Sequence, residues 1–91
     1  MHIKLGIVMD SIAHINIKKD TSFAMLLAAQ ARGWELHYME LNDLYLRNGV
    51  AFARTRTLKV QRDNQHWYEF VSTQDIALEE LNVILMRKAG I

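Results

Sequence analysis

The sequence predicts an α/β fold in which a central parallel sheet carries a peripheral antiparallel ribbon, all within one domain spanning residues 1–91. Three observations lead to this prediction. A strand, a helix and a second strand follow one another over the first 39 residues, residues 50–61 alternate with a period of two, and residues 83–86 form a second fully apolar run. A helix that crosses between two strands makes those strands parallel, whereas alternation across a tight turn favours an antiparallel pair.

The first half of the chain reads as one strand–helix–strand unit. Residues 3–9 are apolar apart from Lys4 and stop at Asp10, which is typical of a strand buried on both faces. Asp20 or Thr21 is suited to cap a helix that runs to about Arg32, since Gly33 favours the backbone conformation that ends a helix. The strand that follows spans residues 34–39. The helix should bury a stripe made of Phe23, Leu26, Leu27 and Ala31.

The second half is predicted from shorter signals. Asn48-Gly49 is a strong sequence signal for a hairpin turn, and Arg62-Asp63-Asn64-Gln65 predicts another turn. Around these turns we expect a helical turn at 41–44, strands at 45–47, 50–61 and 67–71, a brief helix at 75–81 and a strand at 83–86. The ribbon should lie at the periphery, and the last strand should rejoin the parallel sheet.

Composition narrows the function classes. The 91 residues are 51% hydrophobic and 23% charged with a net charge of +1, which is globular and gives no broad attraction for nucleic acid or membranes. Cysteine is absent, and His2, His14, His37 and His66 lack the spacing of a zinc site, so we expect no metal. The amino-terminal apolar run contains Lys4 and has no cleavage pattern. We therefore expect a cytoplasmic protein without nucleic-acid or membrane partners.

Polar side chains follow the two most apolar strands. Asp10 comes directly after the first, and Arg87 and Lys88 follow the last. Ligands of open α/β sheets bind where the carboxyl ends of neighbouring strands meet, so these groups could share one crevice. Two plainer readings remain open. In one, Asp10 serves only to cap its loop; in the other, Arg87 pairs with Glu79 or Glu80 at a solvated strand end.

Several segments together resemble a known family. They are residues 10–27, Gly33-Trp34-Glu35-Leu36-His37-Tyr38-Met39-Glu40, Asp43-Leu44-Tyr45-Leu46, Thr55-Arg56-Thr57-Leu58-Lys59-Val60 and Val83-Ile84-Leu85-Met86-Arg87-Lys88. These segments are similar in sequence to the amino-terminal, pre-ATP-grasp domain of bacterial glutathione synthetases, and the resemblance spans nearly the whole chain. It implies a Rossmann-like domain. It also implies that the complete enzyme uses ATP and two magnesium ions to join γ-glutamylcysteine to glycine.

The resemblance assigns this chain a substrate-side role. The groups that hold ATP and magnesium belong to the ATP-grasp domains that follow, so we expect no catalytic residue, metal or cofactor here and no ligation by the chain alone. It implies substrate-binding roles for Asp10, Asn16, Ser22 and Arg87. Ser11 stands where the family usually has proline, and Ala89-Gly90-Ile91 replaces an Asp-Pro-Pro stretch. We therefore expect an isolated or shortened domain that binds γ-glutamylcysteine weakly if at all.

Two other functions match parts of the sequence pattern. A phospho-receiver module also has an aspartate after its first strand, but it needs an acidic pair there, and Met9 precedes Asp10. A self-associating scaffold without ligand function remains an alternative, because strands at the sheet margin and an uncovered apolar face favour association.

Overall fold

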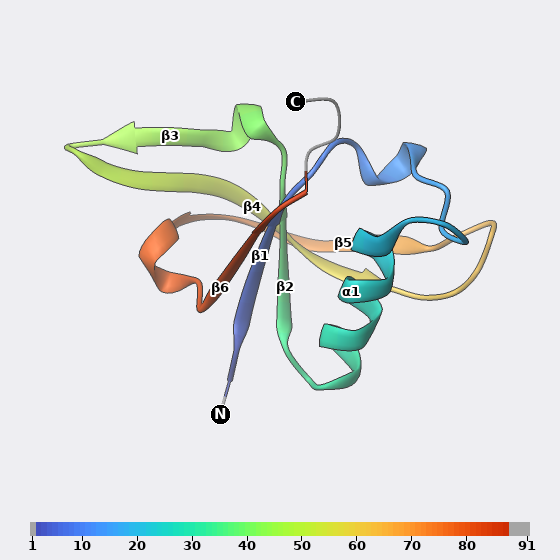
Figure 1. The fold of residues 1–91 in the computed structure, drawn as a ribbon. Coiled ribbons are helices and arrows are strands. Elements are labelled where there is room, and N and C mark those ends of the chain that lie inside the picture. The colour runs from blue at the N-terminus through green and yellow to red at the C-terminus, as the bar shows by residue number, and fades with distance from the viewer. Residues whose placement is uncertain (1, 88–91) are drawn as a thin grey trace.

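The computed structural model describes residues 2–87, and one mixed β-sheet organises them (Figure 1). In chain order the elements are β1 (Lys4–Val8), η1 (Ile12–His14), α1 (Thr21–Ala31), β2 (Glu35–Met39), η2 (Leu41–Asp43), β3 (Leu44–Arg47), β4 (Val50–Val60), β5 (Tyr68–Ala77), η3 (Leu78–Glu80) and β6 (Val83–Met86). The η elements are single 3₁₀ turns. The strand order is β3-β4-β2-β1-β6, and β5 pairs with the free side of β4.

Three parallel strands form one side of the sheet. β1 lies between β2 and β6, with Ile7 opposite both Tyr38 and Leu85. The expected parallel pairing of the first and last apolar strands is confirmed. β6 is not buried on both faces, however, because Val83 and Leu85 face the core while Ile84 and Met86 are exposed. This alternating burial is typical of an edge strand that is itself covered on one face only.

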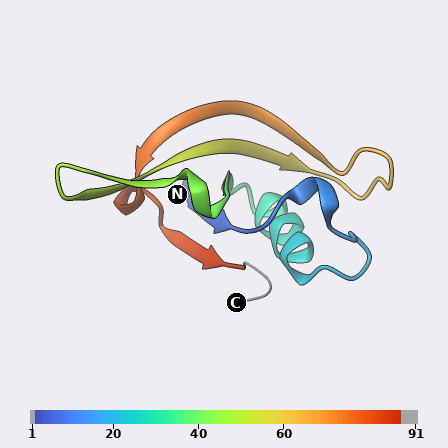
Figure 2. The same cartoon turned by 90° about the horizontal axis from the view of Figure 1, so that it is seen from above.

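The antiparallel strands are peripheral only in part, because β3 and β5 are edge strands whereas β4 is central, which corrects the sequence prediction. β4 has eleven residues and pairs with β2, β3 and β5. Because it is about twice as long as the parallel strands, β4 extends beyond them in both directions and carries its other partners along its length. Figure 2 shows β4 and β5 as a long curved ribbon over the rest of the molecule. The result is a mixed, curled sheet with one α-helix among the described residues, and the expected Rossmann-like parallel core is not confirmed.

The prediction of a brief helix at 75–81 is also wrong. Asp75, Ile76 and Ala77 continue β5 opposite Arg54, Ala53 and Phe52, and only Leu78–Glu80 turn. Helix propensity here is outweighed by tertiary contacts, because β5 pairing lets Ile76 and Ala77 become buried.

Helix α1 begins and ends close to the predicted residues. The Asp20 carboxylate accepts a hydrogen bond from the Phe23 N–H at 2.9 Å, and Gly33 takes a φ of +80° just beyond the helix end. Phe23, Leu26 and Ala29 are buried against the sheet, whereas Ala31, expected in the stripe, is exposed.

The sheet has a core on each face. Helix α1 covers the first, which includes Ile7, Leu36 and Tyr38; the second contains Val8, Met39, Ala53, Ile76 and Leu81. β4 supplies both, giving Ala53 to the second core and Leu58 and Val60 to the first. The change of buried face coincides with a register shift between Thr57 and Leu58, where β5 contains an extra residue.

Candidate functional site

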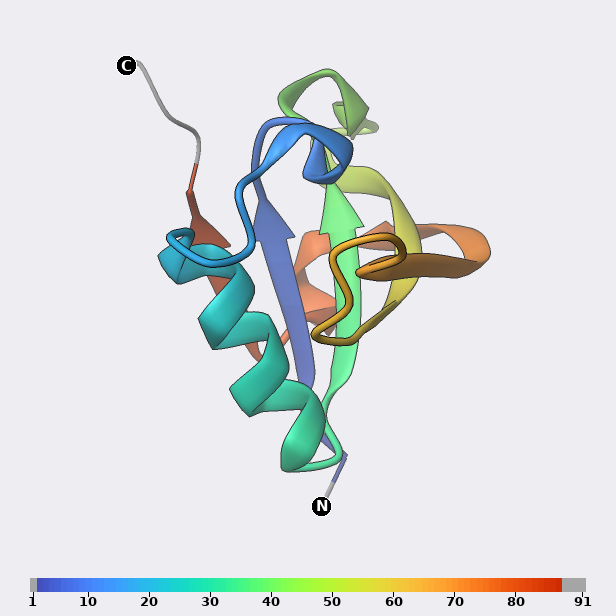
Figure 3. The same cartoon turned by 90° about the vertical axis from the view of Figure 1, so that its right-hand side faces the viewer.

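The carboxyl ends of β1 and β6 and the start of α1 meet at one end of the sheet, as Figure 3 shows. A pocket of about 300 Å³ lies there, lined by Met9, Asp10, Ser11, His14, Ile15, Asp20, Ser22 and Arg87. Three of the four residues that the family resemblance implied, Asp10, Ser22 and Arg87, therefore come together. The parallel pairing of β1 and β6 is the reason that residues 65 and more positions apart share this pocket.

Arg87 is fixed on the helix start. Its Nε donates to Ser22 Oγ at 3.1 Å, and its Nη2 donates to Thr21 Oγ1 at 2.8 Å. Its backbone N–H donates to the Val8 carbonyl at 2.7 Å, which continues the ladder between β1 and β6. Arg87 thus contacts hydroxyls of α1, and not Glu79 or Glu80 as the plainer reading had it; the Glu80 carboxylate accepts from the Ala77 N–H.

One guanidinium, that of Arg87, and two carboxylates, those of Asp10 and Asp20, line the pocket. The guanidinium of Arg87 and the amino-terminal end of α1 favour an anion, and the Asp20 carboxylate already caps that end by accepting from the Phe23 N–H. Asp10 is exposed at the end of β1 and lines the same pocket. An ammonium and a carboxylate on one small molecule would match this arrangement.

Asn16 does not line this pocket. Its Oδ1 accepts from the Lys18 N–H at 3.0 Å, and its carbonyl accepts from Lys19 and Asp20. In the structure Asn16 therefore shapes the loop that leads into α1. Lys88 and Ala89-Gly90-Ile91 lie outside the described residues.

Two residues that the sequence prediction missed hold the loop between β1 and α1. The buried Tyr38 hydroxyl accepts from the Ile12 N–H at 3.2 Å, and Trp67 Nε1 donates to the Ile12 carbonyl at 2.9 Å. The Tyr38 hydroxyl also donates to Glu40 Oε2 at 2.5 Å. The pKa of Tyr38 is raised well above its usual range, mainly by burial and next by this hydrogen bond to Glu40. The hydroxyl therefore stays protonated.

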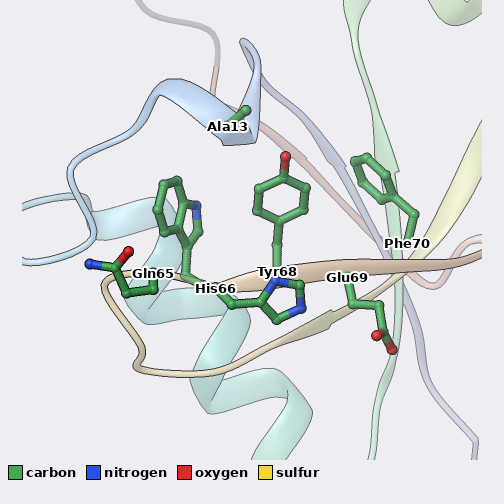
Figure 4. A pocket seen from close by; sticks show the side chains of 7 residues that line it. Ala13, Gln65, His66, Tyr68, Glu69 and Phe70 are labelled. Carbon is green, nitrogen blue, oxygen red and sulfur yellow. The ribbon is translucent and has the colours of Figure 1, made fainter.

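A second hollow of about 470 Å³ lies between η1 and the start of β5. Tyr68 and Phe70 stand on the same side of the ribbon as Ala13 in Figure 4, and their ring centroids are 5.3 Å apart. Tyr38 packs on Phe70 at 5.2 Å, so this aromatic cluster supports the residue that anchors Ile12. In the sequence, the only signal for this aromatic cluster is the run of aromatic residues within 67–70.

Residues 2–87 contain neither a cluster of metal-ligating side chains nor a membrane-spanning helix. No group of three or more His, Asp or Glu side chains is arranged to hold a metal ion there. In the same residues no helix combines the length and the apolar character needed to cross a bilayer.

Known proteins resemble this chain closely. The family model for the N-terminal domain of prokaryotic glutathione synthetase matches residues 3–89. Proteins named glutathione synthetase from Salmonella typhimurium, Photorhabdus laumondii and Yersinia pestis are 73%, 70% and 66% identical to it over 86 residues. Each match covers 94% of this chain but 27% of the relative, so the chain spans about a quarter of the length of these proteins. The chain belongs to the family of N-terminal domains of prokaryotic glutathione synthetase.

Proposed function

We propose that this chain is the substrate-side domain of an ATP-dependent ligase that joins γ-glutamylcysteine to glycine, and that it does not perform the ligation alone. The family membership supports the reaction class, and the matched segment is the part of the relatives that the family model describes as N-terminal. The observation that carries the assignment is the pocket that Asp10, Ser22 at the start of α1 and Arg87 line together.

The chemistry of the pocket suits one end of the peptide substrate. γ-Glutamylcysteine carries an ammonium and a carboxylate on its glutamyl carbon and a second carboxylate at its cysteinyl end. In this proposal Arg87 and the amino-terminal end of α1 hold a carboxylate, Asp10 holds the ammonium, and Ser22 keeps the guanidinium in place. Asn16 contributes by fixing the loop that forms one wall.

ATP and magnesium do not fit the residues described here. Within residues 2–87 the carboxylates and histidines form no cluster suited to a divalent cation, and the sequence has no glycine-rich phosphate loop. We therefore place no step of phosphoryl transfer on this chain and assign that step to the rest of the enzyme, with the cytoplasm as its expected compartment.

A hybrid enzyme tests the proposal. Residues 1–87 would replace the matching segment of the Salmonella typhimurium relative, which is 73% identical, and glutathione formation would be assayed. The hybrid should be active. Arg87→Gln should raise KM for γ-glutamylcysteine about tenfold or more, because one charge-assisted contact is lost, while KM for ATP stays unchanged.

The matched control is Arg54→Gln, which removes a guanidinium that pairs with Asp75 on the exposed ribbon. Arg54→Gln should leave the KM values for γ-glutamylcysteine, glycine and ATP unchanged. A folded but inactive hybrid, or an Arg87→Gln effect on ATP in place of the peptide, would contradict the proposal.

A further inference from the structure

One short loop supplies half of the pocket at the carboxyl end of β1, which we call the peptide pocket. Of the eight residues that line this pocket, four lie on the loop that contains η1: Asp10, Ser11, His14 and Ile15. The position of η1 therefore decides the shape of one wall of the pocket, and with it the fit of the peptide.

This loop is tied to the rest of the fold through a single residue. Within the described residues, both hydrogen bonds that residues 10–15 make to other elements go to the main chain of Ile12. Its N–H donates to the Tyr38 hydroxyl at 3.2 Å, and its carbonyl accepts from Trp67 Nε1 at 2.9 Å. Internal hydrogen bonds onto Ser11 shape the turn but do not place it on the sheet.

Trp67 is the anchor that comes from farthest along the chain. It stands at the end of the β4–β5 connection, which lies close to η1 in Figure 3. The Gln61 N–H donates to the Trp67 carbonyl at 3.0 Å, and Gln61 Nε2 donates to the His66 carbonyl at 2.6 Å, so this connection is closed by its own hydrogen bonds. Trp67 lines the aromatic hollow together with Ala13 of η1, and not the peptide pocket. The indole therefore holds the wall of the peptide pocket from behind.

Ser11 makes the loop dependent on such an anchor. It takes a φ of −50° and a ψ of 121° at the start of η1. A proline would hold φ at about −65°, within roughly 15° either way, and would keep this conformation without outside help. A serine has other conformations open to it, and ordering them costs entropy. In this chain the hydrogen bonds to Ile12 supply the order that a proline would build into the loop.

We infer that Trp67 is a positioning residue for γ-glutamylcysteine: its N–H holds Ile12, and through η1 it keeps Ser11 and His14 in place at the peptide pocket. This inference rests on the proposed function. When only a fraction of the molecules has the loop in its binding position, the apparent dissociation constant rises by the inverse of that fraction. Loss of the anchor therefore weakens the binding of the peptide and leaves the binding of the other substrates unchanged.

Trp67→Phe in the hybrid enzyme tests this inference, because phenylalanine keeps an aromatic ring but lacks the N–H. The KM for γ-glutamylcysteine should rise about three- to tenfold, which is the effect of one neutral hydrogen bond. The kcat and the KM values for ATP and glycine should stay unchanged. Trp34→Phe is the matched control, since Trp34 is the other of the two tryptophans and lies against Arg32 beyond the carboxyl end of α1. This control should leave the KM for the peptide unchanged.

Ser11→Pro provides a rescue. Added to Trp67→Phe, it should return the KM for γ-glutamylcysteine to within about twofold of the parent hybrid, because φ is then fixed within the loop. The hydrogen bond that it gives up, from the Ala13 N–H to Ser11 Oγ, is long at 3.3 Å. A general loss of packing around Trp67 would not be repaired in this way. If Trp67→Phe does not fold by circular dichroism, Tyr38→Phe takes its place, since it removes the other partner of Ile12 and should give the same split among the KM values.

The inference and the proposed function fail in different ways. If Arg87→Gln raises the KM for the peptide while folded Trp67→Phe and Tyr38→Phe leave it unchanged, the inference is overturned and the proposed function stands. An unchanged KM in Arg87→Gln contradicts the proposed function and the inference with it. Equal rises in KM for all three substrates, or no recovery with Ser11→Pro, would show that Trp67 supports the fold in general, which also overturns the inference.

Discussion

At the scale of single residues, Gln30 replaces a missing strand. β2 pairs with β4 only from Leu36 to Tyr38, which leaves the Val60 end of β4 unpaired on that side. The Gln30 Nε2 donates to the Val60 carbonyl at 2.7 Å, and its Oε1 accepts from the Val60 N–H at 2.8 Å. One amide side chain thus satisfies both main-chain groups, which would otherwise carry the cost of burial without a partner.

Gln30→Ala should accordingly lower the free energy of unfolding by about 1–3 kcal/mol, because two hydrogen bonds beside the buried Val60 are lost. Urea unfolding measures this change. Gln61→Ala is the matched control, since Gln61 also donates to a carbonyl, that of His66, but is exposed. It should cost about 0.5 kcal/mol or less, and an equal cost in both variants would argue against the role of Gln30.

Glu35 gives the fold a dependence on pH. Its carboxylate lies 3.1 Å from His2 Nε2 and 2.5 Å from His37 Nε2. The hydrogen bond with His2 contributes most to lowering the pKa of Glu35 below its ordinary value; partial burial opposes this, and His37 adds to it. Since the pKa is lower in the folded state, the ionised carboxylate stabilises the fold above the unfolded value of about 4.3, and this stabilisation is lost as the pH falls through the folded value.

Glu35→Gln should therefore lower the melting temperature at pH 6 and leave it close to that of the natural chain near pH 3. Thermal unfolding at both pH values checks the prediction. Glu69→Gln, at an exposed carboxylate of β5, should match the natural chain in both conditions. A gap for Glu35→Gln that persists at pH 3 would show that lost packing, and not charge, is responsible.

The residues of the site were predictable to different degrees. Asp10 and Arg87 could be placed together because parallel strands bring their carboxyl ends to one edge. The contacts of Tyr38 and Trp67 with Ile12 could not be predicted, because these hydrogen bonds span 26 and 55 positions and depend on how the ribbon curves. Thr21 had been considered only as a helix cap, and its contact with Arg87 required the exact packing of β6 beside α1.

At the scale of elements, the loop between β1 and α1 is anchored to the sheet through the main chain of Ile12. Both main-chain groups of Ile12 bind side chains, one from β2 and one from the β4–β5 connection. Tyr38→Phe should leave the Ile12 N–H without its partner and speed hydrogen exchange there, with a loss of about 1–2 kcal/mol in unfolding free energy. Exchange followed by NMR tests this. Tyr45→Phe, which removes an exposed hydroxyl, should leave Ile12 unchanged; unchanged exchange in Tyr38→Phe would refute the anchoring role.

Elements set by local signals were predicted well. The Asp20 cap and Gly33 fix α1, and Asn48-Gly49 fixes the β3–β4 hairpin. β5 was predicted too short, and a helix was placed over its end, because the sequence from Asp75 favours a helix and only the pairing with β4 shows otherwise. The central position of β4 follows from its three partners, which alternation within one strand cannot reveal.

At the scale of the whole molecule, β4 links the two cores. Its first half contributes Ala53 to the core opposite α1, and its second half contributes Leu58 and Val60 to the core beneath α1. Neither core is large in a chain of 91 residues, so each depends on the strand that it shares with the other. We therefore expect one cooperative unfolding transition.

Two matched variants test this cooperativity. Ile7→Val removes a methylene from the first core and Ile76→Val removes one from the second, each costing about 0.5–1.5 kcal/mol. In a single cooperative unit, either change lowers the hydrogen-exchange protection of the slowest amides by the same amount in α1 and in β5. If Ile76→Val weakens protection in β5 and leaves α1 unchanged, the two cores open separately and β4 does not couple them.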